Sequence, residues 1–330
     1  APRRPGRRLL MQRPLFKPAS ALQFVVNGQA GHGDAEATRE AIEAGLREAG
    51  RSGAVVFAAP GELARVAREA ATRARADGSA VVAVGGDGTI NTVAQAAHAA
   101  GCTLGVIPRG TFNYFAREHG APLETAEALR WLLDARPEPV QISAINDQVF
   151  LVNASLGLYP DLLQDRESWK ARFGRSRLVA FGAGMATLLR AQRRLKLSMA
   201  WDGKVVEVRT LTLFVGNNRL QLEQLGLAGT DTPAEDAAAD GHITALILKP
   251  IGTLAMLGLM LRGALGQLGE ASGIERFVCQ SMVVKPTRMM GRRKVKVAFD
   301  GEVAWMRSPL NIRVLPQPLW LLKAAPEIAP

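Results

Sequence analysis

Short apolar runs alternate with longer amphipathic segments through the first half of the chain. The apolar runs have the length of buried strands, and the segments between them repeat apolar residues at helical spacing. Strands that alternate with helices predict a parallel sheet with right-handed crossovers, in which ligands bind beyond the carboxyl ends of the strands. The predicted strands are residues 22–26, 53–58, 80–84 and 103–107, and the predicted helices are residues 35–49, 61–76 and 90–100.

Beyond residue 137 the pattern changes to shorter β-like segments, which favour a second, mostly antiparallel domain. We therefore expect an α/β domain at residues 20–140 and a β-rich domain at residues 141–330, whose C-terminal segment could return to the first domain. Residues 1–19 are rich in Arg and Pro, which is typical of a disordered basic arm. The clearest strands of the second domain are residues 149–154, 205–215, 243–248, 282–285 and 295–299.

Composition and charge narrow the class of partner. The chain has 330 residues, a formal net charge of +11 and only 5% aromatic residues. Such a charge suits nucleic acid, an anionic membrane surface or a phosphorylated ligand, but the scarcity of aromatic side chains argues against nucleic acid. Cys102 and Cys279 lie far apart and match no metal-binding spacing, so a reduced cytoplasmic protein is the simpler interpretation.

Two apolar stretches with basic ends, residues 176–194 and 251–266, have the pattern of helices that lie on an anionic membrane. A core helix with solvated ends has the same pattern. The longest apolar run, residues 251–261, is too short to span a bilayer. We therefore expect a cytoplasmic protein that associates peripherally with membranes, and an exposed edge strand in the second domain could support a homodimer.

The most informative segment is Gly-Gly-Asp-Gly-Thr at residues 85–89, between a predicted strand and a predicted helix. A glycine turn at this junction admits positive φ, directs backbone N–H groups toward an anion and leaves no Cβ in the way of a phosphate. Asp87 stands where a phosphate would bind, which points to a metal ion or to a hydrogen bond within the turn. The alternative is an ordinary turn, because Gly and Asp are common turn residues.

The chain resembles the diacylglycerol-kinase catalytic family, which includes bacterial lipid kinases and the sphingosine and ceramide kinases. The glycine segment alone is shared with NAD kinases and phosphofructokinases, whereas residues 110–117 match a pattern much more specific to the lipid kinases. The resemblance implies an NAD-kinase/phosphofructokinase-like N-terminal domain and ATP-dependent phosphorylation of a membrane lipid. Diacylglycerol is the default acceptor, with phosphatidylglycerol or ceramide as alternatives. The motifs that carry the resemblance are Asn27-Gly28, residues 85–91, residues 108–117, residues 153–157, Asp240-Gly241 and Asp300-Gly301-Glu302.

The resemblance also implies a role for each matching residue. Glu302 matches the general base for the lipid hydroxyl, with Asp300 beside it as a second catalytic residue. Asp240 matches a position that binds a structural magnesium, helped by backbone carbonyls near Ala237 and His242, and Asp87 would work through Mg²⁺ at the phosphates. The ATP-binding residues would be Asn27, Gly85, Gly86, Asp87, Gly88, Thr89, Ile90, Asn91, Thr111 and Asn113.

Simpler interpretations compete with several of these roles. Taken alone, residues 300–302 are typical of a hairpin turn, and Asp240-Gly241 fits a turn as well as a metal site. The sequence also departs from the family pattern. Gly28 stands in place of the usual Pro, Thr92 in place of a frequent Glu and Tyr114 in place of Asp. Two other functions therefore stay open: an NAD kinase, which shares the glycine segment, and a non-catalytic regulator that binds ATP or lipid.

Overall fold

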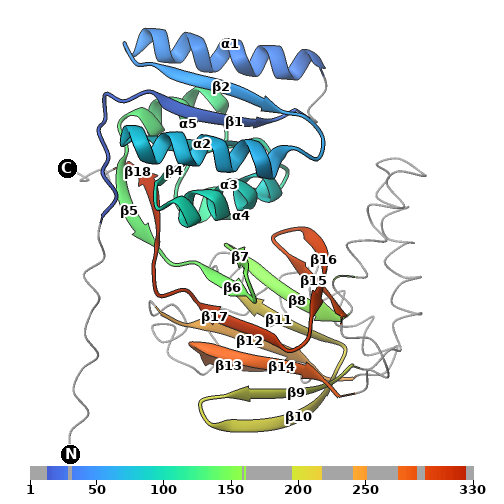
Figure 1. Cartoon of the computed structure of the whole chain (residues 1–330). Coiled ribbons are helices and arrows are strands. Elements are labelled where there is room, and N and C mark those ends of the chain that lie inside the picture. The colour runs from blue at the N-terminus through green and yellow to red at the C-terminus, as the bar shows by residue number, and fades with distance from the viewer. Residues whose placement is uncertain are drawn as a thin grey trace, which may run out of the picture. The chain divides into compact units, whose positions relative to one another are not determined.

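The computed structural model describes residues 13–28, 32–157, 160, 195–217, 241–250, 274–287 and 294–324 (Figure 1). The chain forms two compact units: unit 1 holds residues 1–140 and 316–330, and unit 2 holds residues 141–315. The predicted apolar helices at 176–194 and 251–266 lie outside the described residues, as do Ala237 and Asp240. Among the helices that the structure does describe, none is long and apolar enough to cross a bilayer.

The sheet of unit 1 has the strand order β2-β1-β3-β4-β18-β5. Strands β1 to β4 are mutually parallel, as the alternating pattern predicts. Strand β18 then runs parallel to β4 and antiparallel to β5, so the last described strand lies inside the sheet begun by the first. The strands are β1 (Leu22–Asn27), β2 (Gly53–Ala58), β3 (Ala80–Gly85), β4 (Thr103–Pro108), β5 (Arg136–Val140) and β18 (Leu319–Lys323).

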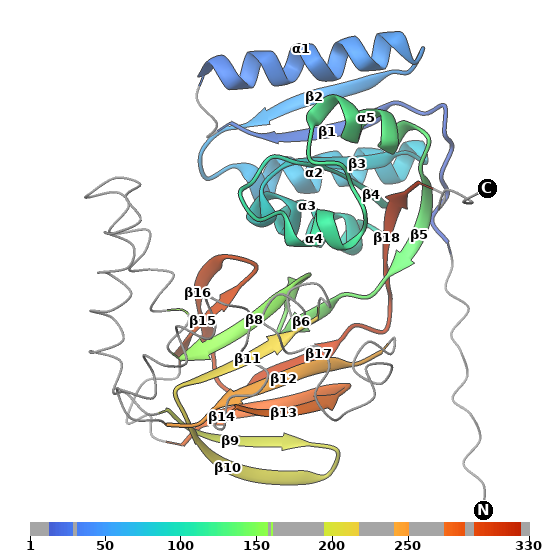
Figure 2. The same ribbon diagram turned by 180° about the vertical axis from the view of Figure 1, so that it is seen from behind.

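Helices cover both faces of this sheet (Figures 1 and 2). Helices α2 and α3 pack against each other on one face, and α1 and α5 pack together on the other. Small residues permit the close approach: α2 buries Val66 and four alanines at helical spacing and ends at Gly78, whose φ of 64° closes the helix. The helices are α1 (His32–Glu48), α2 (Leu63–Asp77), α3 (Asp87–Ala100), α4 (Tyr114–Glu118) and α5 (Thr125–Leu133).

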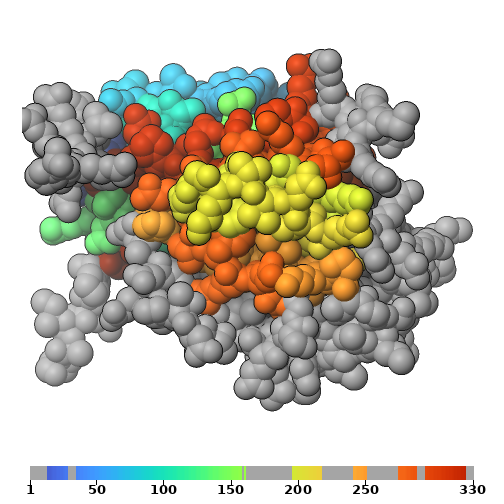
Figure 3. All heavy atoms as spheres, turned by 90° about the horizontal axis from the view of Figure 1, so that it is seen from below, coloured from blue at the N-terminus to red at the C-terminus, as the bar shows by residue number. Residues whose placement is uncertain are grey.

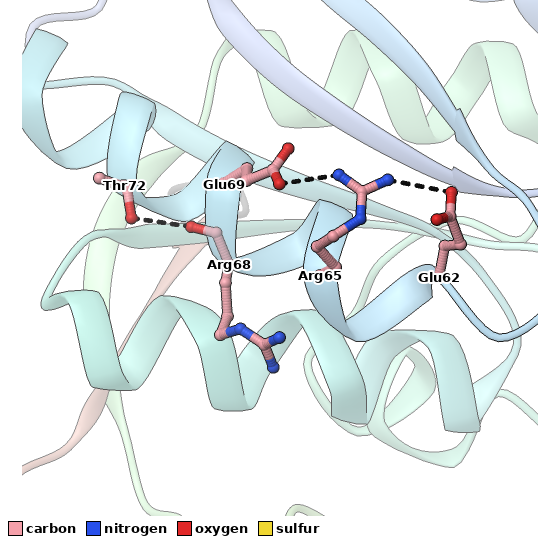
Figure 4. Close-up of polar contacts among 5 residues, drawn as sticks. All are labelled: Glu62, Arg65, Arg68, Glu69 and Thr72. Atoms are coloured by element: carbon pink, nitrogen blue, oxygen red, sulfur yellow. Dashed lines mark hydrogen bonds and ion pairs between the residues drawn. The ribbon is translucent and has the colours of Figure 1, made fainter.

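The solvent side of α2 carries a small charged network (Figure 4). The Arg65 guanidinium donates to Glu69 at 2.8 Å and to Glu62 at 2.9 Å, one helical turn to either side. Hydrogen bonds to these carboxylates raise the pKa of Arg65, which therefore stays charged. Because all three side chains are exposed, we assign this network to the support of the helix surface and not to a binding site.

Unit 2 is built from two six-stranded antiparallel sheets, as expected for a mostly antiparallel second domain. The first has the order β10-β9-β14-β17-β6-β7 and the second has the order β13-β12-β11-β8-β15-β16. Apolar side chains from both sheets form one core, in which Phe150, Leu213 and Ile312 are fully buried. The strands are β6 (Ser143–Ile145), β7 (Gln148–Phe150), β8 (Asn153–Gly157), β9 (Leu195–Trp201), β10 (Lys204–Thr210), β11 (Thr212–Gly216), β12 (Ile243–Leu248), β13 (Ile274–Cys279), β14 (Ser281–Pro286), β15 (Lys294–Phe299), β16 (Glu302–Arg307) and β17 (Leu310–Val314).

Two segments predicted as single strands are each divided in two. Residues 149–154 form the end of β7 and the start of β8, because backbone N–H groups between them turn toward the carboxylate of Asp300. Residues 205–215 form β10 and β11, which separate at Leu211, where the Thr210 hydroxyl bonds to the backbone of Thr212. In both places a side chain satisfies the backbone and ends the ladder, which no apolar pattern records.

The β9–β10 hairpin forms one end of its sheet, and its atoms are yellow on the face seen in Figure 3. The turn residues Asp202 and Gly203 both have positive φ, as a two-residue hairpin turn requires. On β10, Val205 is 71% exposed and the neighbouring Lys204 and Glu207 also face solvent. This strand is therefore an exposed edge with mixed charges.

Candidate active site

The glycine segment joins β3 to α3. Gly86 has extended backbone angles and precedes Asp87, which is the first residue of the helix. The helix therefore begins three residues before the predicted start at residue 90. The prediction followed the apolar periodicity, and the first turn of a helix needs no apolar side chain. N–H groups in the first turn of a helix have no intrahelical acceptor and lie at the positive end of the helix dipole. Residues 87–89 therefore form a backbone site suited to an anion.

The glycines of this turn are required for space. Neither Gly85 nor Gly86 has a positive φ, so the expected conformational reason is wrong for these two residues. A Cβ on Gly85 would lie 2.6 Å from the Thr89 hydroxyl oxygen, and one on Gly86 would lie 3.2 Å from the Cα of Gly110. A Cβ on Gly110 would lie 2.7 Å from the Cα of Gly86. The glycine turn and the loop after β4 are therefore in backbone contact.

Asp87 has one engaged and one unengaged carboxylate oxygen. Its Oδ2 accepts the backbone N–H of Asn113 at 3.0 Å. Its Oδ1 is buried and has no hydrogen-bond partner among the described residues. Burial raises the pKa of Asp87, and backbone N–H groups, chiefly that of Asn113, offset part of this rise. A buried oxygen that lacks a donor is a site at which a cation can bind.

Asn113 holds the loop after β4 in place. Its backbone is left-handed, with φ 52° and ψ 43°, a conformation that Asn tolerates better than most residues. Its side-chain amide accepts the N–H of Gly110 at 2.8 Å and donates to the carbonyl of Gly110 at 2.9 Å. Since its backbone N–H reaches Asp87, Asn113 connects the loop to the carboxylate. Its side chain is buried, so the described contacts are internal to the site.

Two further side chains cross the carboxyl edge of this sheet. Asn27, at the end of β1, donates to the Thr89 hydroxyl at 3.2 Å. Arg109 follows β4; its N–H donates to the carbonyl of Gly85 at 2.8 Å and its guanidinium bonds to the hydroxyl of Thr38 on α1. Arg109 was absent from the predicted site residues, although an arginine directly after a strand at this edge was visible in the sequence.

The remaining predicted ATP-binding residues differ in accessibility. Ile90 and Asn91 are buried in α3, so their side chains support the turn from within. Thr111 is exposed in the loop after β4. The structure thus brings Asn27, the glycine turn and Asn113 together through hydrogen bonds, while Ile90 and Asn91 are buried in the helix that follows the turn.

The predicted catalytic carboxylates lie on a hairpin of unit 2. Asp300 and Gly301 have φ of 44° and 87° and form the two-residue turn between β15 and β16. The buried Asp300 carboxylate accepts the N–H groups of Leu151, Val152 and Asn153 at 2.6, 2.9 and 3.0 Å. Glu302 begins β16 and is exposed. Asp300 therefore anchors the turn, and Glu302 is the carboxylate that can reach a substrate.

The proposed structural magnesium site is described only at His242. The carbonyl of His242 accepts from the side-chain amide of Gln141 at 2.8 Å, and the N–H of Gly241 donates to the same side chain at 2.5 Å. Among the described residues, no group of three or more His, Cys, Asp or Glu side chains gathers as a metal site. A magnesium ion at Asp87 does not need such a group, because Mg²⁺ is commonly held by one or two carboxylates plus substrate phosphates.

A sequence model of the diacylglycerol kinase catalytic domain matches residues 21–145. A Pseudomonas aeruginosa (strain UCBPP-PA14) protein named "Probable lipid kinase YegS-like" is 34% identical over 270 residues, which cover 79% of this chain and 80% of the relative. The chain belongs to the diacylglycerol kinase catalytic family. A second family member, the diacylglycerol kinase of Bacillus subtilis (strain 168), is 33% identical over 57% of this chain and 60% of its own length.

The family fold is also seen in a crystal structure of a candidate diacylglycerol kinase from Bacillus anthracis str. Sterne. Its TM-score is 0.69 at 21% identity, over 94% of this chain and 98% of that chain. Within this family, the departure at Gly28 has a local explanation. Its N–H donates to the carbonyl of Ala58 at 3.1 Å, which a proline could not do, and a Cβ would lie 2.8 Å from the same oxygen.

Proposed function

We propose that the protein is an ATP- and Mg²⁺-dependent lipid kinase that transfers the γ-phosphate to a hydroxyl of a diacylglycerol-like membrane lipid. The observation that carries the proposal is the unpartnered Oδ1 of Asp87 in the first turn of α3, next to N–H groups suited to phosphate. The names of the family relatives support a lipid as acceptor. Phosphatidylglycerol and ceramide are the alternative acceptors.

In this proposal the residues of unit 1 position the nucleotide. The N–H groups at the start of α3 bind phosphate oxygens, and the absence of side chains at Gly85 and Gly86 leaves room for Thr89 and for the loop at Gly110, which hold the turn in place. Asn113 holds Asp87 through Oδ2 and leaves the buried Oδ1 available to a cation. Mg²⁺, when bound there, neutralises charge on the phosphate oxygens. The Asp240 site with the carbonyls near Ala237 and His242 remains a second, structural magnesium proposal.

In unit 2, Glu302 acts as the general base. Its carboxylate accepts the proton of the lipid hydroxyl, the hydroxyl oxygen forms a bond to the γ-phosphorus, and the bond to the β–γ bridging oxygen breaks, releasing ADP. Asp300 is a positioning residue in this scheme, because both of its carboxylate oxygens accept backbone N–H groups. Its role is to fix the hairpin from which Glu302 projects.

An NAD kinase is the second candidate, since the glycine turn alone suits either enzyme. One experiment separates the two and includes the regulator as a third outcome. The full chain is incubated with γ-labelled ATP and Mg²⁺ and, in separate reactions, with diacylglycerol, phosphatidylglycerol, ceramide or NAD. We expect label in a lipid, lost in Asp87→Asn and Glu302→Gln and retained in Glu207→Gln, a matched change at an exposed glutamate of β10.

Two results would reject the proposal. Label in NAD would favour the NAD kinase. Binding of ATP without transfer to any acceptor would favour the non-catalytic regulator. If Glu207→Gln also lost transfer, the loss in Glu302→Gln would not be specific to that position. Glu207 is a suitable control because it lies on a different strand of the same unit.

A further inference from the structure

The hairpin of β15 and β16 has two faces of opposite character. Residues directly opposite each other on paired strands share a face, so the strand register assigns each side chain to one side. The face toward the core of unit 2 carries Val295, Val297, Phe299, Ala304 and Met306. The opposite face carries the buried Ala298 and the half-buried Val303 near the turn, and Lys294, Lys296, Trp305 and Arg307 toward the open end of the hairpin. We refer to these last four residues as the basic hairpin face.

The basic hairpin face is unfavourable for the folded chain by itself. Lys294 lies directly opposite Arg307, and like charges in this arrangement destabilise a strand pair. Trp305 lies opposite Lys296 and is 58% exposed, which leaves a large apolar side chain in water on the last strand of the sheet. Trp305 and its basic neighbours do not belong to the apolar core of unit 2, so the arrangement suits a partner outside the chain.

We propose that the basic hairpin face docks on an anionic lipid surface, an inference that rests on the proposed action on a membrane lipid. Lysine and arginine near an anionic bilayer each contribute attraction, and tryptophan is favoured at the boundary between headgroups and hydrocarbon. The acidic Glu302 is paired with Phe299 and so lies on the face toward the core, not on the basic hairpin face. The face therefore carries positive charge around an exposed aromatic ring.

The basic hairpin face lies close along the strand to the proposed base. Trp305 follows Glu302 by three residues on β16, which places the two Cα atoms about 10 Å apart at the rise of an extended strand. The odd spacing puts the two side chains on opposite faces of the strand, so a bilayer that holds Trp305 at headgroup depth meets the face away from Glu302. The acceptor lipid would therefore have to rise from the bilayer surface to reach Glu302.

Protection of an edge strand is the competing explanation, because lysines at an edge discourage pairing with other chains. Strand β10 provides the comparison. It is also an exposed edge with apolar and basic residues, but Glu207 lies between Val205 and Arg209 on its outer side. An edge-protection role predicts equal behaviour of the two strands toward lipid, whereas our proposal predicts lipid binding by the β15–β16 hairpin alone.

The test is co-sedimentation of the full chain with phosphatidylcholine vesicles that contain phosphatidylserine, without ATP or acceptor lipid. The variant Lys294→Glu/Arg307→Glu keeps two like charges opposite each other, so its strand pairing is comparable to that of the wild type. The control Lys204→Glu/Arg209→Glu makes the same charge change on β10. We expect partitioning to fall by at least about 30-fold in the hairpin variant and by much less in the control. Salt should weaken wild-type binding.

A single change, Lys294→Glu, keeps the proposal testable if the double variant folds poorly. It places opposite charges across the strand pair, so stability should hold or rise while vesicle binding falls about fivefold. Equal losses in the hairpin and β10 variants, or no loss in either, would overturn the proposal. Transfer of phosphate from ATP to dispersed short-chain diacylglycerol is measured in parallel. Absence of transfer would reject the proposed kinase function, and the vesicle experiment would still test membrane docking of the hairpin.

Discussion

Two Asp-Gly pairs serve opposite purposes in the two units, one at the start of a helix and one in a hairpin turn. Asp300 in unit 2 meets three backbone N–H groups, which use both of its oxygens. Asp87 in unit 1 is held through Oδ2 by the N–H of Asn113, and its buried Oδ1 has no donor in the part of the chain that the structure describes. The difference lies in how many N–H groups the neighbouring segment offers. A carboxylate with all its acceptors filled anchors structure, and one with a vacant acceptor can take a ligand.

The largest expected effect is the loss of stability on replacing the anchor. Asp300→Ala leaves the N–H groups of residues 151–153 buried without an acceptor, and each such group costs about 1–3 kcal/mol. We expect the free energy of unfolding to fall by about 4 kcal/mol, measured by urea denaturation. A loss below about 1 kcal/mol would mean that the anchor is dispensable.

The second prediction reverses the pattern at Asp87. Because burial raises the pKa of Asp87, the ionised carboxylate is a cost to the fold, and Asp87→Asn should leave stability unchanged or slightly higher. Phosphoryl transfer should fall about 10²–10³-fold, measured with saturating lipid and varied ATP. If Asp87→Asn instead lowered the free energy of unfolding and the folded variant kept its specific activity, the assigned roles of the two aspartates would have to be exchanged.

The third prediction concerns the connection between the loop after β4 and Asp87. Asn113→Ala removes the side-chain hydrogen bonds to Gly110 and favours a different backbone conformation. We expect the KM for Mg²⁺-ATP to rise about tenfold, with a smaller change in kcat. Asn113→Gly keeps the left-handed backbone and should recover part of the affinity, whereas equal loss in both variants would assign the effect to the side chain alone.

The smallest effect concerns pH and is confined to unit 1. Burial, with a contribution from Lys323, lowers the pKa of His119 to about 4, against about 6.5 in an unfolded chain. Between these values the unfolded chain binds more protons, so stability falls as the pH decreases through this window and is fully present above it. The denaturation midpoint of His119→Gln should therefore change less from pH 7 to pH 5 than that of the wild type.

Local signals in the sequence were sufficient for the parallel core and for the glycine turn. Apolar runs such as residues 53–58 and 243–248 correspond to β2 and β12 with the predicted bounds. Strands β16 and β17 were not predicted, because the apolar run of β16 is only four residues long and β17 alternates apolar with polar residues. The helix α5 was also missed, although its buried residues Ala128, Leu129 and Leu132 have helical spacing.

The parts of the site that the sequence could not provide are contacts between distant segments. The anchoring of residues 151–153 by Asp300 joins positions about 150 apart in the chain, and no local pattern encodes it. The contact of Arg109 with Thr38 has the same character. Family resemblance identified Asp300 and Glu302 as a pair, but only the hydrogen bonds separate the anchor from the exposed carboxylate.

The return of β18 to the first sheet has a consequence for synthesis of the protein. Strand β18 lies between β4 and β5, and its pairing with β4 joins residues more than 200 positions apart. On the ribosome, the sheet that carries the glycine turn must wait for residues 319–323, with unit 2 emerging in the interval. The first unit to be translated is thus the last to be completed, and premature release of the chain would leave β4 as an open edge.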